Sequence, residues 1–310
     1  MAIEHAAVQV ARKPWGVTDL HPWSSMDASN NPVGELWFQR VDKHAPAPAL
    51  LLKLLFTSEP LSIQVHPDDK FARSMGLPNG KSEAWYILAG APGARVAIGL
   101  KQHLTPEQLR ASIKDGSIAS LTRWRPVAKG DIIFVPAGTI HAIGAGIVLA
   151  EIQQRSDTTF RLFDYGRQRE LDEDNAVAVS EAAPAQTQAR QRRLTATRTA
   201  LITSQHFILE RVELQGNSRW MLNADRETWV LLIEGCARIE SISASVGDAV
   251  YAQAERAEIE VGSGGMSCLI GYPGPNPLVA LLQEAGEPMT DRAGSSVDSP
   301  KSTENVDVAT

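Results

Sequence analysis

Gln64 and His66 are the first residues along the chain whose spacing suggests shared chemistry. They lie in the stretch LSIQVHPDDK, where apolar and polar residues alternate. Residues two apart on a strand share one face, so an amide and an imidazole would point the same way. Two interpretations are open: a solvated polar face of a strand, or part of a metal site whose other ligands lie elsewhere in the chain.

Two further donors stand at fixed spacings later in the sequence. Glu83 is followed by six residues and a glycine, and GDIIFVPAGTIH places His141 at the end of the pattern G-x5-P-x-G-x2-H. Together with His66, these spacings resemble the two sequence motifs of the cupin superfamily. The chain departs from the cupin pattern at Gln64, where the first motif usually has a histidine, and at Ala145, where the second has an asparagine.

The chemistry of these donors favours a divalent cation. Two imidazoles, one carboxylate and one amide oxygen form a borderline-hard set that suits Zn²⁺ and leaves coordination positions open, as catalytic zinc sites do. We therefore expect one Zn²⁺ per chain, held by Gln64, His66, Glu83 and His141. The other histidines have no such context and are predicted to be ordinary surface or core residues: His5, His21, His44, His103 and His206.

Glutamine in place of a motif histidine narrows the resemblance to the type I phosphomannose isomerases, in particular their short bacterial form. QVHP followed by K-x-E, the P-x-G-x-x-H turn and the arginine in SDTTFRLFDYGR carry this resemblance. It extends over most of the chain, from residue 13 to about residue 275. Further matching stretches are KPWG at 13–16, VGELW at 33–37, LLLKLL at 50–55 and AEIQQRSDTTFR at 150–161.

The resemblance implies an isomerase that interconverts mannose 6-phosphate and fructose 6-phosphate through an enediol. It implies the same four zinc ligands, a catalytic Arg161 that also contacts substrate, Lys81 in the substrate site, and Glu151 as an acidic pocket residue. Lys81 and Glu151 are alternatives for the proton carrier. Longer members of the family often have a histidine before that lysine, where this chain has Gly80, so any ring-opening role of that histidine does not transfer.

The elements that must position these residues are expected to form a mainly β fold. Two cupin-type β-barrel or jelly-roll units are predicted, with a small helical insertion in the first. Thr105, Pro106 and Gln108 supply the N-cap, the first-turn proline and the capping-box partner of that helix. Turn-bounded apolar runs predict the strands. They lie at 49–56, 82–90, 95–100, 131–138 and 147–153, and later in HFILERVEL, TWVLLIEG, DAVYAQ and SCLIGY.

Four segments are predicted along the chain. Residues 1–185 form the catalytic cupin, 186–199 a polar crossover, 200–285 a degenerate cupin without metal ligands, and 286–310 a disordered tail with too few apolar residues to fold. The loss of ligands is inferred by aligning Gly235 and Gly247 with the motif glycines. The ligand glutamate is then replaced by Thr228, and the motif proline, glycine and histidine by Gln253, Glu255 and Glu258.

Composition limits the classes of partner. With 310 residues, 43% hydrophobic and 21% charged, the chain is long and apolar enough to bury a core. A net charge of −6 argues against nucleic acid as a partner. We expect a cytoplasmic monomer or homodimer that binds a sugar phosphate and no membrane, since neither a signal peptide nor an apolar run of about 18 residues is found. Cys236 and Cys268 form no C-x-x-C pattern and are predicted to be buried thiols.

Two alternative functions stay open for a cupin, because the fold does not decide among its chemistries. A non-catalytic sugar-phosphate-binding or regulatory protein would keep the pocket without needing Arg161. No helix-turn-helix pattern supports a DNA-binding regulator. A metal-dependent cupin oxygenase would favour iron with more histidine ligands, and the pair Gln64 and Glu83 counts against it.

Overall fold

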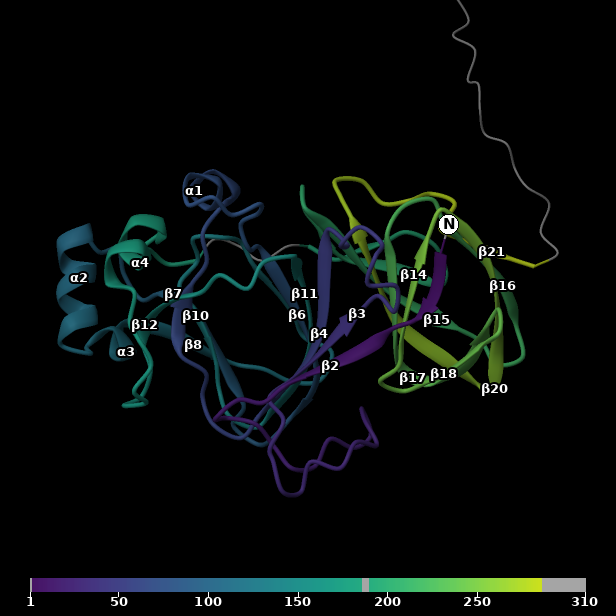
Figure 1. The fold of residues 1–310 in the computed structure, drawn as a ribbon, viewed down its shortest axis with the longest axis horizontal. Coiled ribbons are helices and arrows are strands. Elements are labelled where there is room, and N and C mark those ends of the chain that lie inside the picture. The colour runs from purple at the N-terminus through teal and green to yellow at the C-terminus, as the bar shows by residue number, and fades with distance from the viewer. Residues whose placement is uncertain (1, 186–189, 286–310) are drawn as a thin grey trace, which may run out of the picture.

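The computed structural model describes residues 2–185 and 190–285, in which antiparallel β-sheets are the main secondary structure (Figure 1). The predicted mainly β fold class is confirmed. Residues 186–189 of the predicted crossover and the whole predicted tail, 286–310, lie outside the described residues. Within the described ranges, no helix combines the length and hydropathy that a membrane span requires.

A six-stranded sheet forms the middle of the molecule. Its two central strands, β4 and β11, pair along their whole length, from Leu50 opposite Gln154 to Thr57 opposite Ile147. Every residue of β4 is buried, because both faces of this sheet are covered. The strand order is β2-β3-β4-β11-β6-β9. The bounds are β2 (Ala7–Ala11), β3 (Glu35–Gln39), β4 (Leu50–Thr57), β6 (Glu83–Gly90), β9 (Ile132–Val135) and β11 (Ile147–Gln154).

A five-stranded sheet faces it and completes the first barrel, in the order β12-β5-β10-β7-β8. Its bounds are β5 (Ile63–Val65), β7 (Arg95–Leu100), β8 (Thr122–Pro126), β10 (His141–Ile143) and β12 (Phe160–Phe163). Ile63 and Val65 point out of the barrel into an apolar cluster with helix residues such as Leu109 and Ile113. Gln64 therefore points the other way, into the barrel, and lines its pocket.

Helices cover the outer face of this second sheet at one end of the molecule (Figure 1). The predicted helix is confirmed as α2 (Pro106–Lys114), with a complete capping box between Thr105 and Gln108. It buries Leu109 and Ile113, and the next buried apolar residue, Ile118, belongs to a separate short helix, α3 (Ile118–Leu121). The other helices are α1 (Asp69–Ser74) and α4 (Glu173–Val179).

The remaining strands form a ten-stranded sheet that closes into the second unit. The N-terminal strand β1 pairs with β19, so this sheet includes a strand from the start of the chain. The predicted boundaries near residues 185 and 200 stay a prediction. The bounds are β1 (Ala2–His5), β13 (Arg192–Arg193), β14 (Arg198–Thr203), β15 (Phe207–Leu214), β16 (Arg219–Ala224), β17 (Thr228–Ile239), β18 (Ile242–Ser245), β19 (Ala249–Gln253), β20 (Glu255–Pro273) and β21 (Leu282–Glu284).

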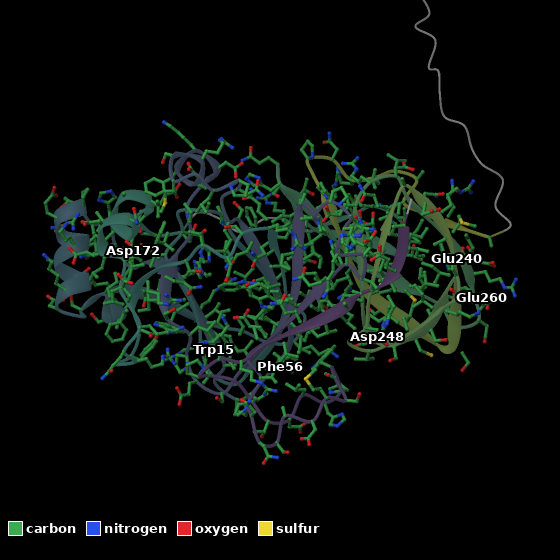
Figure 2. The ribbon with its side chains drawn as sticks, viewed as in Figure 1. Trp15, Phe56, Asp172, Glu240, Asp248 and Glu260 are labelled. Atoms are coloured by element: carbon green, nitrogen blue, oxygen red, sulfur yellow. The ribbon has the colours of Figure 1, made fainter. Side chains whose placement is uncertain are left out.

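The two units share one hydrophobic core. Leu52 and Phe56 of β4 belong to the same apolar cluster as Trp229 and Leu269 of the second unit. Figure 2 places Phe56 near the middle of the long axis, where the units meet. Contact is so close at Gly271 that an added Cβ would lie 2.0 Å from the Cδ1 atom of Ile152. The second unit therefore supports the outer face of β4 and β11, whose inner face looks into the first barrel.

Candidate metal centre and active site

Three of the predicted ligands meet inside the first barrel. His66 follows β5, Glu83 begins β6 and His141 begins β10. Gln64 lies directly opposite His141 across the β5–β10 pair, while Glu83 comes from the facing sheet. One donor atom from each of His66, Glu83 and His141 lies within 4.8 Å of the others, and all three side chains are buried. Residues distant in the sequence thus form one compact site.

Both histidines present Nε2 to this site. The Nδ1 atom of His66 lies 2.9 Å from the carbonyl oxygen of Thr158, and that of His141 lies 2.8 Å from the carbonyl oxygen of Thr139. An Nδ1–H that donates to a carbonyl leaves the Nε2 lone pair free. Burial, with a smaller contribution from Lys81, lowers the pKa of His66 to about 3, and burial also lowers the pKa of His141. Both rings are therefore neutral near pH 7.

Glu83 supplies a negative charge between the two rings. Its Oε2 atom lies 3.4 Å from His66 Nε2 and its Oε1 atom 3.4 Å from His141 Nε2. Burial alone would raise the pKa of Glu83, but Lys81 at 3.2 Å and the histidines hold that pKa well below its usual value. Among the described residues, His66 Nε2 and Glu83 Oε2 are buried without a hydrogen-bond partner. Buried orphan donors of this kind fit a bound divalent cation.

Gln64 lies beside the same site but presents its nitrogen to it. The amide Nε2 atom is 3.3 Å from His141 Nε2, and the oxygen accepts a hydrogen bond of 3.0 Å from Ser62 Oγ. Because metals bind the amide oxygen, ligation by Gln64 requires the amide to turn over. Three of the four predicted donors are therefore in place, and the fourth needs this one rotation.

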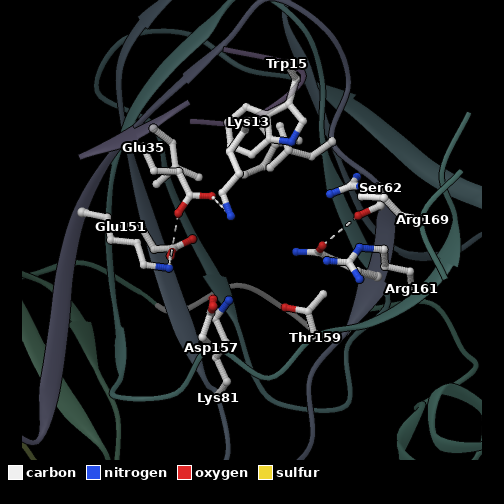
Figure 3. A pocket seen from close by; sticks show the side chains of 15 residues that line it. Lys13, Trp15, Glu35, Ser62, Lys81, Glu151, Asp157, Thr159, Arg161 and Arg169 are labelled. Atoms are coloured by element: carbon white, nitrogen blue, oxygen red, sulfur yellow. Dashed lines mark hydrogen bonds and ion pairs between the residues drawn. The ribbon is translucent and has the colours of Figure 1, made fainter. Parts of the chain in front are cut away.

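Beside the site lies a pocket that is partly open to solvent (Figure 3). Lys81, Glu151 and Arg161 all line it, and the roles that the resemblance implies for them stay predictions. Sequence reasoning missed other lining side chains: Lys13, Trp15, Glu35, Lys53, Ser62, Asp157, Thr159 and Arg169. Several sit in matched stretches such as KPWG and VGELW, and Lys53 is the one charge in the apolar run LLLKLL.

Buried acids and lysines alternate at one side of the pocket (Figure 3). The Lys53 ammonium lies 3.2 Å from Glu151 Oε1 and 3.8 Å from Glu35 Oε2. Burial and the nearby Glu83 raise the pKa of Glu151, and Lys53 opposes this. Burial would lower the pKa of Lys81, but Glu83 and Glu151 raise it above its ordinary value. Lys81 therefore carries a positive charge. Of the two side chains, Glu151 is the one that gains or loses a proton more easily.

Guanidinium groups lie across the pocket from these acids. Figure 3 shows Arg161 and Arg169 beside Ser62, opposite Glu35 and Glu151. Burial and the nearby Arg169 lower the pKa of Arg161, although an arginine stays charged at neutral pH. The Nε atom of Arg161 is buried and makes no hydrogen bond within the described part of the chain. Arg161 thus has donor capacity to offer a ligand.

The segment that carries Lys81 is clamped to the start of α1. Asp69 Oδ1 accepts hydrogen bonds of 2.8 Å from the N–H of Gly80 and from the side-chain amide of Gln154. Gln154 in turn accepts the N–H of Ser82, and the N–H of Lys81 donates to the carbonyl of Pro67. A Cβ at Gly80 would lie 2.5 Å from the carbonyl carbon of Asp68. A side chain at position 80 would therefore clash with the backbone at the start of α1.

We expect Gly80→Ala to lower both stability and activity. The methyl group would push residues 80–82 away from α1, at a cost of about 1–3 kcal/mol for overpacking. Thermal unfolding of the purified variant measures the first effect and steady-state kinetics the second. Gly264→Ala is the matched control, because a Cβ at Gly264 meets nothing within 4 Å. Equal melting temperatures for the two variants would contradict the clamp.

The second unit repeats the contact between Glu83 and Trp85, but on the opposite face of its sheet. Glu227 accepts the indole N–H of Trp229 at 3.0 Å, just as Glu83 accepts that of Trp85 at 3.1 Å. Trp85 packs inside the first barrel, whereas Trp229 packs in the cluster between the two units. The register shifts two residues before Gly90 in β6 and two residues before Gly235 in β17, so Thr228 remains the position that corresponds to Glu83.

Backbone N–H groups donate hydrogen bonds to the carboxylate of Glu227. It accepts the N–H groups of Ala49 and Leu50 at 2.5 and 2.9 Å, at the start of β4. An apolar cluster that includes Val230, Leu232 and Cys268 fills the interior of this unit. In the described ranges, the His66, Glu83 and His141 group is the one cluster of its kind placed to hold a metal. Cys268 is a buried thiol as predicted, whereas the prediction for Cys236 was wrong, because it is exposed.

No protein-family model matches the chain. It is 38% identical to mannose-6-phosphate isomerase of Streptococcus mutans over 133 residues, which are 43% of this chain and 42% of that protein. It is 44% identical to mannose-6-phosphate isomerase ManA of Bacillus subtilis over 119 residues, 38% of each chain. The matched segments thus span less than half the length of these relatives. The resemblance seen in the sequence motifs is confirmed at this level.

Solved structures share the fold over most of the chain. A crystal structure of mannose 6-phosphate isomerase from Bacillus subtilis matches with a TM-score of 0.74 at 23% identity, covering 88% of this chain and 100% of that chain. A variant of phosphomannose isomerase from Salmonella typhimurium matches with a TM-score of 0.69 at 14% identity, with the same coverage. At these identities the likeness establishes the fold.

Proposed function

We propose that this protein is a metal-dependent isomerase that interconverts mannose 6-phosphate and fructose 6-phosphate. The observation that carries the proposal is the His66, Glu83 and His141 cluster beside a pocket that is lined by Glu151 and Arg161. Gln64 and Lys81 line the same pocket and contact His141 and Glu83 of the cluster. The partial sequence similarity to mannose-6-phosphate isomerases supports the choice of substrate. We further propose one zinc ion per chain, because two neutral imidazoles with carboxylate and amide oxygens suit it.

The reaction moves a proton between C2 and C1 of the sugar through an enediol, so negative charge develops on the sugar oxygens. A divalent ion held by Gln64, His66, Glu83 and His141 would stabilise that charge when bound. Arg161 faces the same space and offers its N–H groups to the enediolate oxygen. Glu151 is the favoured proton carrier and Lys81 the alternative. Burial raises the pKa of Glu151 toward the range where a carboxyl group can both accept and return a proton.

A turnover assay on the purified full-length chain tests the proposal. We expect zinc-loaded protein to convert mannose 6-phosphate into fructose 6-phosphate, and to exchange the C2 proton of the aldose with solvent. A panel of other aldose 6-phosphates run beside it measures preference. Binding of sugar phosphate without ketose product and without proton exchange would reject the isomerase and favour the sugar-binding cupin.

A further inference from the structure

Trp85 places a single N–H group between two buried carboxylates. Its Nε1 atom lies 3.1 Å from Glu83 Oε1 and 3.1 Å from Glu151 Oε2, and the side chain is fully buried. The strands explain this position. Trp85 lies two residues after Glu83 on β6 and directly opposite Glu151 on β11, so all three side chains share the inner face of the sheet.

Among the described residues, this N–H is the one hydrogen-bond donor that the two acids share. Lys81 Nζ lies 3.2 Å from Glu83 Oε2, and Lys53 Nζ lies 3.2 Å from Glu151 Oε1. The other two oxygens, Glu83 Oε1 and Glu151 Oε2, both contact the N–H of Trp85. Without a shared donor between them, the two carboxylates would repel each other. The indole is neutral and keeps its N–H at every pH. It can therefore satisfy both oxygens without adding a charge beside the candidate metal centre.

Other tryptophans in the chain show what is special about this arrangement. Trp37 donates to Glu35, and Trp229 to Glu227, each across the same two-residue spacing. Those N–H groups have one carboxylate partner each. The N–H of Trp85 has two: one belongs to a proposed metal ligand and the other to the proposed proton carrier.

We propose that Trp85 is a positioning residue that fixes the carboxylate of Glu151 relative to the metal ligand Glu83. The bond to Glu83 restrains the metal-binding carboxylate, as hydrogen bonds to ligating carboxylates do elsewhere. The bond to Glu151 then sets where the proton carrier stands with respect to substrate bound at the metal. The catalytic part of this inference rests on the proposed isomerase function, whereas the metal-binding part does not.

The test is Trp85→Phe, which removes the N–H and keeps an aromatic ring against His141. Trp229→Phe is the matched control, since it removes the same bond from Glu227 in the second unit, away from the pocket. Three quantities are measured on each full-length variant: zinc affinity by chelator competition, melting temperature, and kcat and KM at saturating zinc.

For Trp85→Phe we expect zinc affinity to fall by about 10-fold or more, the scale seen when partners of metal ligands are removed. We also expect kcat to fall by at least about 10-fold, with KM changed far less, because the proton carrier is displaced after substrate has bound. Trp229→Phe should lower the melting temperature and leave zinc affinity and kcat near wild type.

Wild-type zinc affinity and kcat in Trp85→Phe, with only a lower melting temperature, would overturn the inference. If Trp85→Phe fails to fold, replacement of Trp85 by 3-benzothienylalanine keeps the bicyclic shape and removes the N–H, and the same expectations apply to it. A wild-type protein without isomerase activity would reject the proposed function, and the zinc affinities would still decide whether Trp85 restrains Glu83.

Discussion

Arg161→Ala is expected to lower kcat for mannose 6-phosphate by about 10²-fold or more, the scale seen when a group that stabilises transition-state charge is lost. Arg161 lies in the pocket wall opposite Glu151, with a buried Nε that makes no hydrogen bond in the described structure. If its guanidinium acts mainly on the enediolate, KM and zinc content should change far less than kcat. Steady-state kinetics and metal analysis of the purified variant measure these quantities.

Two further variants sharpen this test. Arg161→Lys should recover little activity, because an ammonium cannot reproduce the planar array of N–H donors. Arg110→Ala is the control: its guanidinium pairs with Glu173 and Asp174 at the surface of the helical region, so kcat should stay at wild type. A variant of Arg161 that loses affinity but keeps kcat would assign it to phosphate binding. The metal and Lys81 would then supply the stabilising charge.

Removal of the metal should abolish isomerase activity altogether, and added zinc should restore it. The reason is the donor set: His66, Glu83 and His141 converge on one point, and in the described ranges the buried His66 Nε2 and Glu83 Oε2 atoms have no hydrogen-bond partner. His141→Ala should bind zinc much more weakly, since it removes a neutral imidazole and the geometry that Thr139 imposes on it.

Chelator titration of the holoenzyme, followed by metal content and activity, measures this effect. His103→Ala serves as the control, because His103 is exposed and lies outside the pocket. Full activity in a preparation free of metal would reject the metal-dependent mechanism, whatever the fold.

The sequence predicted the elements that local signals determine. The capping box at Thr105 and Gln108 located α2, and turn-bounded apolar runs located strands such as Arg95–Leu100. The spacing of Glu83 and His141 was informative for the same reason, because each marks a fixed position at the start of a strand. Residues whose role depends on one strand and its flanking turn could be recognised from a single sequence.

Features that depend on pairing between distant strands could not be predicted. Lys53 belongs to an apolar run, and its partner Glu151 becomes its neighbour only through the β4–β11 register. Glu227 accepts the N–H groups of Ala49 and Leu50 only because the two units pack against each other. The start of the chain gave no sign that β1 would pair with β19, since an edge position is set by the assembled sheet.

Three tryptophan side chains in the described structure each donate an N–H hydrogen bond to the carboxylate of the glutamate two residues earlier. The pairs are Glu35–Trp37, Glu83–Trp85 and Glu227–Trp229. The bond lies within one strand, so it does not depend on what the carboxylate meets across the interior. It offsets part of the cost of taking that carboxylate out of water. The remaining oxygen can then face a lysine ammonium, a metal centre or backbone N–H groups. The same contact therefore occurs inside the first barrel, at Glu83, and between the units, at Glu227, so a buried glutamate with a tryptophan partner is by itself no proof of a metal site.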